Sequence, residues 1–246
     1  MRGLSPFGLC YGPPGVGKTL SARHYAKWDL LEEVFRRRFL EDYTVPTELK
    51  DCRCLYYVAP VVKTPSRIEG DLHKIRVDLS NAVGDATAAY EGREKRSMYE
   101  NDPTELMIVD EADRLKLAGL ELLRDIYDRE QIGLILIGMP GLEKRLSRYP
   151  QLYSRVGFAH EFKPLSQEEV RFILERKWDE LGLPFHPDDF TDAEAVTALI
   201  RITGGNFRLI HRMFAQIERI LEINELKTIT KEVVEVARQS LVIGHI

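Results

Sequence analysis

The sequence has little cysteine and no long apolar run. Its three cysteines, Cys10, Cys52 and Cys54, are too few and too badly spaced for a disulfide framework, and a C-x-C pair with one further cysteine is a poor zinc site. We interpret them as reduced packing residues. No apolar run approaches the ~18 residues that a membrane span needs, and the N-terminus lacks the apolar core of a signal peptide. We therefore expect a cytoplasmic protein with no membrane partner.

The sequence also has little net charge. Its formal charge of -4 argues against a protein that is basic all over, although it leaves room for one basic face. The chain has no internal repeat, no low-complexity tract and no base-contacting motif. Its 246 residues are enough for one large domain or for a core with a smaller lid.

A glycine- and proline-rich stretch, "YGPPGVGKTL", fits the phosphate-binding pattern G-x-x-x-x-G-K-[ST]. Small residues let successive backbone N–H groups converge on an anion, so a nucleoside triphosphate is the expected ligand. Lys18 would reach the β- and γ-phosphates, Thr19 would bind Mg²⁺, and a helix predicted over 18–28 would add its dipole. A turn without a ligand is the alternative. The predicted cofactor-binding residues here are Gly12, Pro13, Pro14, Gly15, Val16, Gly17, Lys18, Thr19 and Leu20.

An acidic pair, Asp110 and Glu111, follows the apolar run 106–109 in "ELMIVDEADRL". The run indicates a buried parallel strand, and ligands bind at the carboxyl ends of such strands. Asp110 would hold Mg²⁺ through water, and Glu111 would polarise the attacking water as a general base. The alternative is an ordinary helix start, with Asp110 as N-cap and Glu111 in the first turn.

The rest of the first two thirds of the chain predicts a parallel α/β sheet flanked by helices. Strands are expected at 7–11, 54–62 and 132–140, because these runs are short, apolar and rich in β-formers. Between 66 and 102 we expect one helix at about 73–80 and another at about 85–98.

The pattern changes after Pro164. A capping box, Ser166 with Glu169, opens a helix that ends near Gly182, and three further helical segments follow at 192–205, 206–224 and 230–241, the last capped by Thr230. Helices that follow an α/β region predict a second, all-helical lid. The expected domains are therefore 1–164 and 165–246.

Together these motifs resemble the AAA+ ATPases over nearly the whole chain. The finer resemblance is to the TniB/TnsC/MuB-like transposition regulators, and it lies in "DEADRL", "LIGMPGLEKRLSRYPQLYSRVGFAHEF" and "GGNFRLIHRMF". Members of that branch usually carry additional sequence before the first strand.

The resemblance implies roles for four more residues. Arg155 resembles an arginine finger that reaches the γ-phosphate of an adjacent protomer, with Arg148 as the second candidate. Arg208 resembles the second sensor, which couples the lid to the γ-phosphate. Met139 occupies the first sensor position, where a thioether cannot donate a hydrogen bond, so hydrolysis is expected to be slow. A solvated surface arginine is the alternative for each arginine.

A site completed by a neighbour implies a homo-oligomer, either a closed ring or a helical filament. Basic clusters repeated along such an assembly could follow the backbone of duplex DNA, although a single cluster is usually a solvated face. The resemblance favours Lys63, Arg67, Arg93, Lys95 and Arg96 as DNA contacts.

Two functions follow as hypotheses. In the first, the protein is an ATP- and Mg²⁺-dependent ATPase whose ATP-bound oligomer coats DNA and marks a target for a transposase. In the second, it is an ATP-gated adaptor, like a helicase loader or a secretion accessory ATPase, that grips a protein partner and turns over little. Glu111 and Arg155 favour the first function, because an adaptor needs neither water activation nor a cation supplied in trans. Met139 favours the second, because it implies slow hydrolysis.

Overall fold

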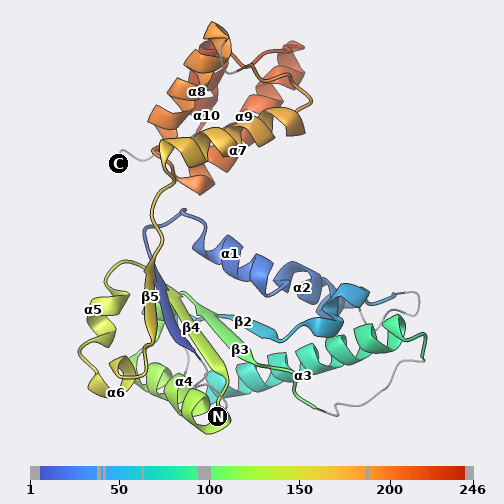
Figure 1. The fold of residues 1–246 in the computed structure, drawn as a ribbon, viewed down its shortest axis with the longest axis vertical. Helices are drawn as coiled ribbons and strands as arrows, with labels where there is room; N and C mark the ends of the chain where they lie inside the picture. The colour runs from blue at the N-terminus through green and yellow to red at the C-terminus, as the bar shows by residue number, and fades with distance from the viewer. Residues whose placement is uncertain are drawn as a thin grey trace. The chain divides into compact units, whose positions relative to one another are not determined.

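A five-stranded parallel sheet lies at the centre of the first of two compact units (Figure 1). The computed structural model describes residues 6–37, 40, 43–62, 64–93, 101–186 and 189–241. The strands are β1 (Phe7–Tyr11), β2 (Cys54–Val58), β3 (Leu106–Asp110), β4 (Gly133–Gly138) and β5 (Phe158–Glu161). Their order across the sheet is β2-β3-β4-β1-β5, and every adjacent pair is parallel. The predicted α/β fold is confirmed.

Helices flank this sheet (Figure 1). In the first unit they are α1 (Lys18–Tyr25), α2 (Trp28–Arg37), α3 (Pro65–Tyr90), α4 (Leu117–Glu130), α5 (Leu142–Leu146) and α6 (Pro150–Tyr153), with 3-10 turns η1 (Thr47–Asp51) and η2 (Ala112–Arg114). Among the described residues, none of the helices combines the length and apolar character that crossing a membrane requires.

The two faces of the sheet are covered by different helices. Tyr56 of β2 packs its ring against Trp28 of α2, whereas the next residue, Tyr57, donates a hydrogen bond to Asp71 of α3. Successive strand residues point to opposite faces, so α2 and α3 lie on opposite sides of the sheet. On the α3 side, Phe7 of β1 contacts Tyr127 of α4.

The second unit has an apolar core of its own. Its helices are α7 (Gln167–Glu180), α8 (Phe190–Thr203), α9 (Phe207–Asn224) and α10 (Lys231–Ser240). The predicted capping box is confirmed, because Ser166 and Glu169 each accept a hydrogen bond from the other's backbone N–H, and Thr230 caps α10 as expected. Trp178 is the largest fully buried side chain of this core.

The compact units do not follow the chain continuously. The first comprises Met1–Gly12 with Lys18–Glu161, and the second comprises Pro13–Gly17 with Phe162–Ile246. The division into domains 1–164 and 165–246 stays a prediction.

Several predicted boundaries are wrong. The segments expected to form two helices at 73–80 and 85–98 belong, up to Tyr90, to the single helix α3, which continues through Gly70 and Gly84. The helix expected over 18–28 ends at Tyr25, and a new helix begins at Trp28, because Lys27 adopts a left-handed conformation with φ +50°. The strands expected at 54–62 and 132–140 are shorter, and β5 was not predicted.

Candidate functional site

The phosphate-binding pattern forms a tight loop between β1 and α1. Gly15 and Gly17 have φ values of +81° and +99°, a backbone conformation that side-chain-bearing residues rarely adopt. Helix α1 begins at Lys18, directly after the second of these glycines. The pattern therefore has the strand, loop and helix order expected of a phosphate-binding loop.

Lys18 is largely buried, and its ammonium group donates a hydrogen bond of 2.7 Å to the carbonyl oxygen of Gly12. This bond holds the side chain back over the start of its own loop. An ammonium buried at this point adds positive charge beside the first N–H groups of α1, which favours an anion.

Asp110 joins the two predicted motifs. Its side chain is buried, and Oδ2 accepts a 2.7 Å hydrogen bond from the Thr19 hydroxyl, although 91 positions separate the two residues. The same oxygen accepts a 2.8 Å bond from the Tyr56 hydroxyl. Oδ1 accepts the backbone N–H of Glu111 at 2.8 Å. Three donors therefore hold one buried carboxylate beside the first turn of α1.

Tyr56 was not predicted as a site residue. Burial and its hydrogen bond to Asp110 raise the pKa of the Tyr56 hydroxyl, so this group remains a hydrogen-bond donor at neutral pH. Nothing in the run "CLYYVAPVV" marks the residue, because its position next to Asp110 depends on how β2 pairs with β3.

Glu111 has a strained backbone. Its φ of +55° and ψ of +33° lie in the left-handed region, and its side chain forms a 3.5 Å ion pair with Arg114. The side chain is partly exposed at the carboxyl end of β3. The alternative of Asp110 as the cap of an ordinary helix is not what forms here, since only the short turn η2 follows and the residue before it is Glu111, whose side chain makes no capping hydrogen bond.

The end of β4 is tied to the turn after β3. Asp113 Oδ1 accepts the backbone N–H of Met139 at 3.1 Å, and Arg145 donates to the carbonyl oxygens of Asp113 and Leu115. Arg145 lies in the basic stretch 143–148, but these two carbonyl oxygens engage its guanidinium within the fold. Met139, the residue expected at the first sensor position, follows β4 directly.

Arg155 lies after α6 and is engaged within its own chain. Its Nε donates to both carboxylate oxygens of Asp128 on α4, at 2.8 and 2.9 Å, and its Nη1 donates to the carbonyl oxygen of Gln151 at 2.7 Å. The guanidinium holds the pKa of the Asp128 carboxyl below its usual range. Arg148, the second finger candidate, is exposed.

Arg208 lies in the first turn of α9, and its side chain is exposed. Within the second compact unit its backbone N–H donates to the carbonyl oxygen of Gly15 at 2.9 Å. Asn206, the N-cap of α9, donates its side-chain amide to the carbonyl oxygen of Pro14 at 3.0 Å. Sequence reasoning missed Asn206, which has only the signature of a helix cap.

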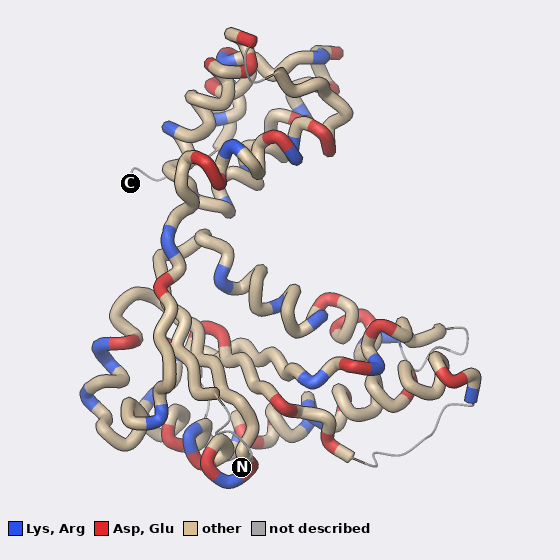
Figure 2. The backbone as a smooth tube through the Cα atoms, in the orientation of Figure 1, with Lys and Arg blue, Asp and Glu red and all other residues tan. Residues whose placement is uncertain are grey.

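Two of the five predicted DNA contacts can be placed. Arg67 is exposed on the first turn of α3, and Arg93 is exposed but forms an ion pair with Glu91. Lys63, Lys95 and Arg96 lie outside the described residues. Figure 2 shows acidic and basic residues mixed along α4 and α7, in keeping with the small net charge.

Within the described part of the chain, no three His, Cys, Asp or Glu side chains gather to form a metal site. The Thr19 hydroxyl and the Asp110 carboxylate nevertheless fit Mg²⁺. They are hard oxygen donors, and Mg²⁺ is commonly bound through one or two such groups together with substrate phosphates and water.

This loop, the acidic strand end and the parallel sheet define a P-loop NTPase. A family model described as "AAA domain" matches residues 2–146. A Staphylococcus aureus protein named "Potential ATP-binding protein" is 49% identical over 241 residues, covering 96% of this chain and 89% of that protein. The chain therefore belongs to the AAA+ ATPase family, and the predicted superfamily is confirmed. The transposition-regulator branch stays a prediction.

Two solved structures share the fold. The Thermotoga maritima RuvB Holliday junction branch migration motor aligns with a TM-score of 0.62 and 19% identity, over 98% of this chain and 63% of that chain. The Aeropyrum pernix ORC1 protein, solved in complex with DNA, aligns with a TM-score of 0.58 and 21% identity, over 95% of this chain and 59% of that one. The chain thus spans less than two thirds of either protein.

Proposed function

We propose that this protein binds ATP with Mg²⁺ and hydrolyses it slowly. The observation that carries the proposal is the 2.7 Å hydrogen bond between Thr19 and Asp110, because it joins the phosphate loop to the acidic strand end. Lys18 then contacts the β- and γ-phosphates, and Thr19 and Asp110 hold the metal. When bound, Mg²⁺ offsets negative charge on the phosphates.

Glu111 is the proposed general base for hydrolysis. It follows the metal-binding Asp110 directly, and its left-handed backbone turns the chain sharply at the end of β3. Strained backbone of this kind persists where the surrounding structure enforces it, and it is concentrated at functional sites. Its ion pair with Arg114 would have to loosen before the carboxylate could accept a proton from water.

Arg155 is proposed to complete the site of a neighbouring copy in a ring or filament. It is partly exposed and carries its charge on a short segment after α6. An arginine finger supplied in trans is worth about 10³ to 10⁵ in rate in GTPases that use one. Arg208 is proposed to sense the γ-phosphate from the start of α9.

The wider proposal is that the ATP-bound oligomer binds duplex DNA without sequence specificity and regulates target selection by a transposase. It is supported by the sequence motifs shared with the TniB/TnsC/MuB-like branch and by the exposed Arg67. The fold shared with RuvB and with the DNA-bound ORC1 protein is in keeping with a DNA-related role.

A second candidate is an ATP-gated adaptor that grips a protein partner. Met139 favours it, because the thioether that follows β4 cannot donate a hydrogen bond to the attacking water. The proposed coat on DNA and the adaptor both require nucleotide binding, and they differ in turnover and in DNA binding.

The test measures ATP affinity, phosphate release and DNA binding on one preparation. Lys18→Ala should abolish nucleotide binding. Arg155→Ala should leave binding nearly intact and lower turnover by about 10³-fold or more, whereas Arg129→Ala, a surface control on α4, should change neither. A wild-type chain that fails to bind ATP at millimolar Mg²⁺ would refute the proposal.

Electron microscopy with ATP, Mg²⁺ and duplex DNA separates the two candidates. DNA-centred rings or filaments, with affinity that falls steeply as salt rises, are expected of the DNA-binding ATPase. Monomers that ignore DNA would favour the adaptor.

A further inference from the structure

The Tyr56 hydroxyl contacts the same oxygen of Asp110 that Thr19 contacts. The register of the sheet explains this, because Tyr56 of β2 lies opposite Ile108 of β3, two residues before Asp110. Residues two apart on a strand share a face, so Tyr56 and Asp110 point to the same side of the sheet. The tyrosine is long enough to cross that diagonal, and its hydroxyl lies 2.8 Å from Asp110 Oδ2.

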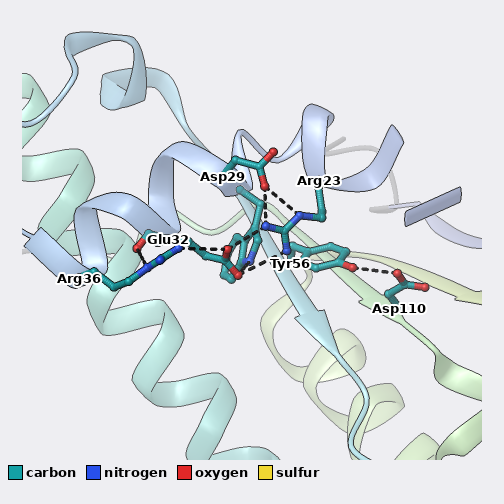
Figure 3. Close-up of polar contacts among 7 residues, drawn as sticks. Arg23, Asp29, Glu32, Arg36, Tyr56 and Asp110 are labelled. Atoms are coloured by element: carbon teal, nitrogen blue, oxygen red, sulfur yellow. Dashed lines mark hydrogen bonds and ion pairs between the residues drawn. The ribbon is translucent and has the colours of Figure 1, made fainter. Parts of the chain in front are cut away.

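Helices α1 and α2 hold the tyrosine ring in place. The Arg23 guanidinium lies 5.7 Å from the ring centroid, and the Trp28 ring centroid lies 5.5 Å away. Arg23 is held in turn by ion pairs with Asp29 and Glu32 (Figure 3). The ring therefore contacts both a cation and an indole, and its hydroxyl is directed at Asp110.

Arg23 and Thr19 are neighbours on one face of α1, since they are four residues apart. Thr19 contacts Asp110, and one turn later Arg23 covers the ring of Tyr56. The helix that follows the phosphate loop thus contacts both members of the Tyr56–Asp110 pair.

The hydrogens around Asp110 Oδ2 restrict what each group can do. The hydroxyls of Thr19 and Tyr56 both donate to this oxygen, which accepts both hydrogen bonds. Thr19 thereby directs its hydrogen at Asp110 and leaves its oxygen lone pairs for another partner. With two donors on Oδ2 and the Glu111 N–H on Oδ1, the carboxylate cannot rotate without losing a hydrogen bond.

We propose that Tyr56 is a positioning residue for Mg²⁺, which orients the Asp110 carboxylate so that it and Thr19 present oxygens to the metal. The inference rests on the proposed MgATP site. Partners of this kind, which contact a ligand rather than the metal, typically change metal affinity by about 10- to 100-fold when they are removed. A merely structural tyrosine would instead contribute to folding alone.

Tyr56→Phe tests this role because it removes only the hydroxyl and keeps the contacts of the ring with Arg23 and Trp28. Tyr57→Phe is the matched control, since that hydroxyl is on the next residue of the same strand but bonds to Asp71 on the opposite face. The full-length variants are titrated with a fluorescent ATP analogue, once in EDTA and once over a series of Mg²⁺ concentrations.

For Tyr56→Phe we expect the Mg²⁺ concentration that gives half of the maximal gain in affinity for the ATP analogue to rise by about 10-fold or more. Affinity in EDTA should stay within about 2-fold of wild type, because the phosphate loop is unchanged. The EDTA measurement also reports folding. Tyr57→Phe should match wild type in both titrations.

Two results would overturn the inference. One is a Tyr56→Phe variant with unchanged or tighter Mg²⁺ dependence, and the other is an equal loss in EDTA and in Mg²⁺, which would indicate a structural role. Failure of the proposed function is distinguishable, because the wild-type chain would then show no Mg²⁺-dependent nucleotide binding at all.

Discussion

Replacing Glu111 with glycine is expected to change the stability of the fold little while nearly abolishing ATP hydrolysis. The residue has a φ of +55° and a ψ of +33°. A left-handed conformation costs a residue with a side chain about 1–2 kcal/mol. Glycine adopts it freely, but its greater freedom in the unfolded chain removes about 0.4–1 kcal/mol of that gain.

The substitution also removes the ion pair with Arg114. Both side chains are 38% exposed, and pairs at such positions contribute about 0.2–1 kcal/mol. The net effect of Glu111→Gly therefore lies between about 1 kcal/mol less stable and about 1.4 kcal/mol more stable than wild type. If Glu111 is the general base as proposed, its loss should lower turnover by about 10²- to 10⁴-fold.

Two other residues provide matched controls for the backbone effect. Gln131 and Glu225 end α4 and α9 with φ values of +53° and +52°. Their glycine variants should gain between about 0 and 1.6 kcal/mol by the same reasoning and keep full turnover. The assays are urea unfolding followed by circular dichroism, and phosphate release at saturating ATP.

The comparison decides why a strained glutamate stands at the end of β3. If Glu111→Gly were less stable than Gln131→Gly by more than about 1–2 kcal/mol, the side chain would have a structural role that the observed contacts do not explain. If it retained wild-type turnover, Glu111 could not be the base.

Three further predictions concern other parts of the chain. Burial raises the pKa of the Cys54 thiol to about 12, so alkylation of this thiol should be slow in the native protein at pH 8. The free energy of unfolding should fall above about pH 9, by up to about 1.4 kcal/mol per pH unit, because only the unfolded thiol then ionises. A free energy of unfolding that stays constant between about pH 9 and 10.5 would contradict this. Gly205→Ala should destabilise the second unit by about 1–3 kcal/mol more than Gly204→Ala, because both residues have positive φ but only at Gly205 would a Cβ lie 2.2 Å from a backbone oxygen. Urea unfolding followed by tryptophan fluorescence measures the difference, and equal losses of stability would refute the prediction. Asp128→Asn removes the ion pair that holds the proposed finger within its own chain, although the hydrogen bond to Gln151 remains. It should raise turnover at low protein concentration by up to about 5-fold relative to the control Asp125→Asn on the same helix, and lower turnover than the control would count against this.

The phosphate loop, the acidic strand end and the helix caps could be predicted because each depends on residues close together in sequence. Gly15 and Gly17 are needed where φ is positive, and Ser166 with Glu169 forms a capping box within one turn. The parallel sheet followed from its apolar strands. At the loop glycines and the helix caps, residues within one turn determine the local structure.

Helix α3 and strand β5 show where local reasoning fails. Two helices were expected at about 73–80 and 85–98, and Gly84 lies in the gap between them, where a glycine inside a helix costs about 1 kcal/mol. The helix continues because residues on both sides of Gly84, including Val83 and Ala86, are buried against the core. Strand β5 was missed because all of its residues are exposed and only its backbone pairing with β1 defines it.

The contacts that refine the candidate site depend on strand register and helix phase together. Tyr56 reaches Asp110 because β2 pairs with β3 in one register, and a shift by one residue would turn its hydroxyl to the opposite face. Arg23 covers the ring because it follows Thr19 by four residues on α1. The register of β2 against β3 is set by the tertiary fold, whereas the spacing of Thr19 and Arg23 is set by the sequence. Neither alone predicts the contact between Tyr56 and Asp110. A residue such as Tyr56 can therefore be recognised only after the strand register is known. The Mg²⁺ titration of Tyr56→Phe measures the effect of its hydroxyl on metal binding, because the buried ring is kept.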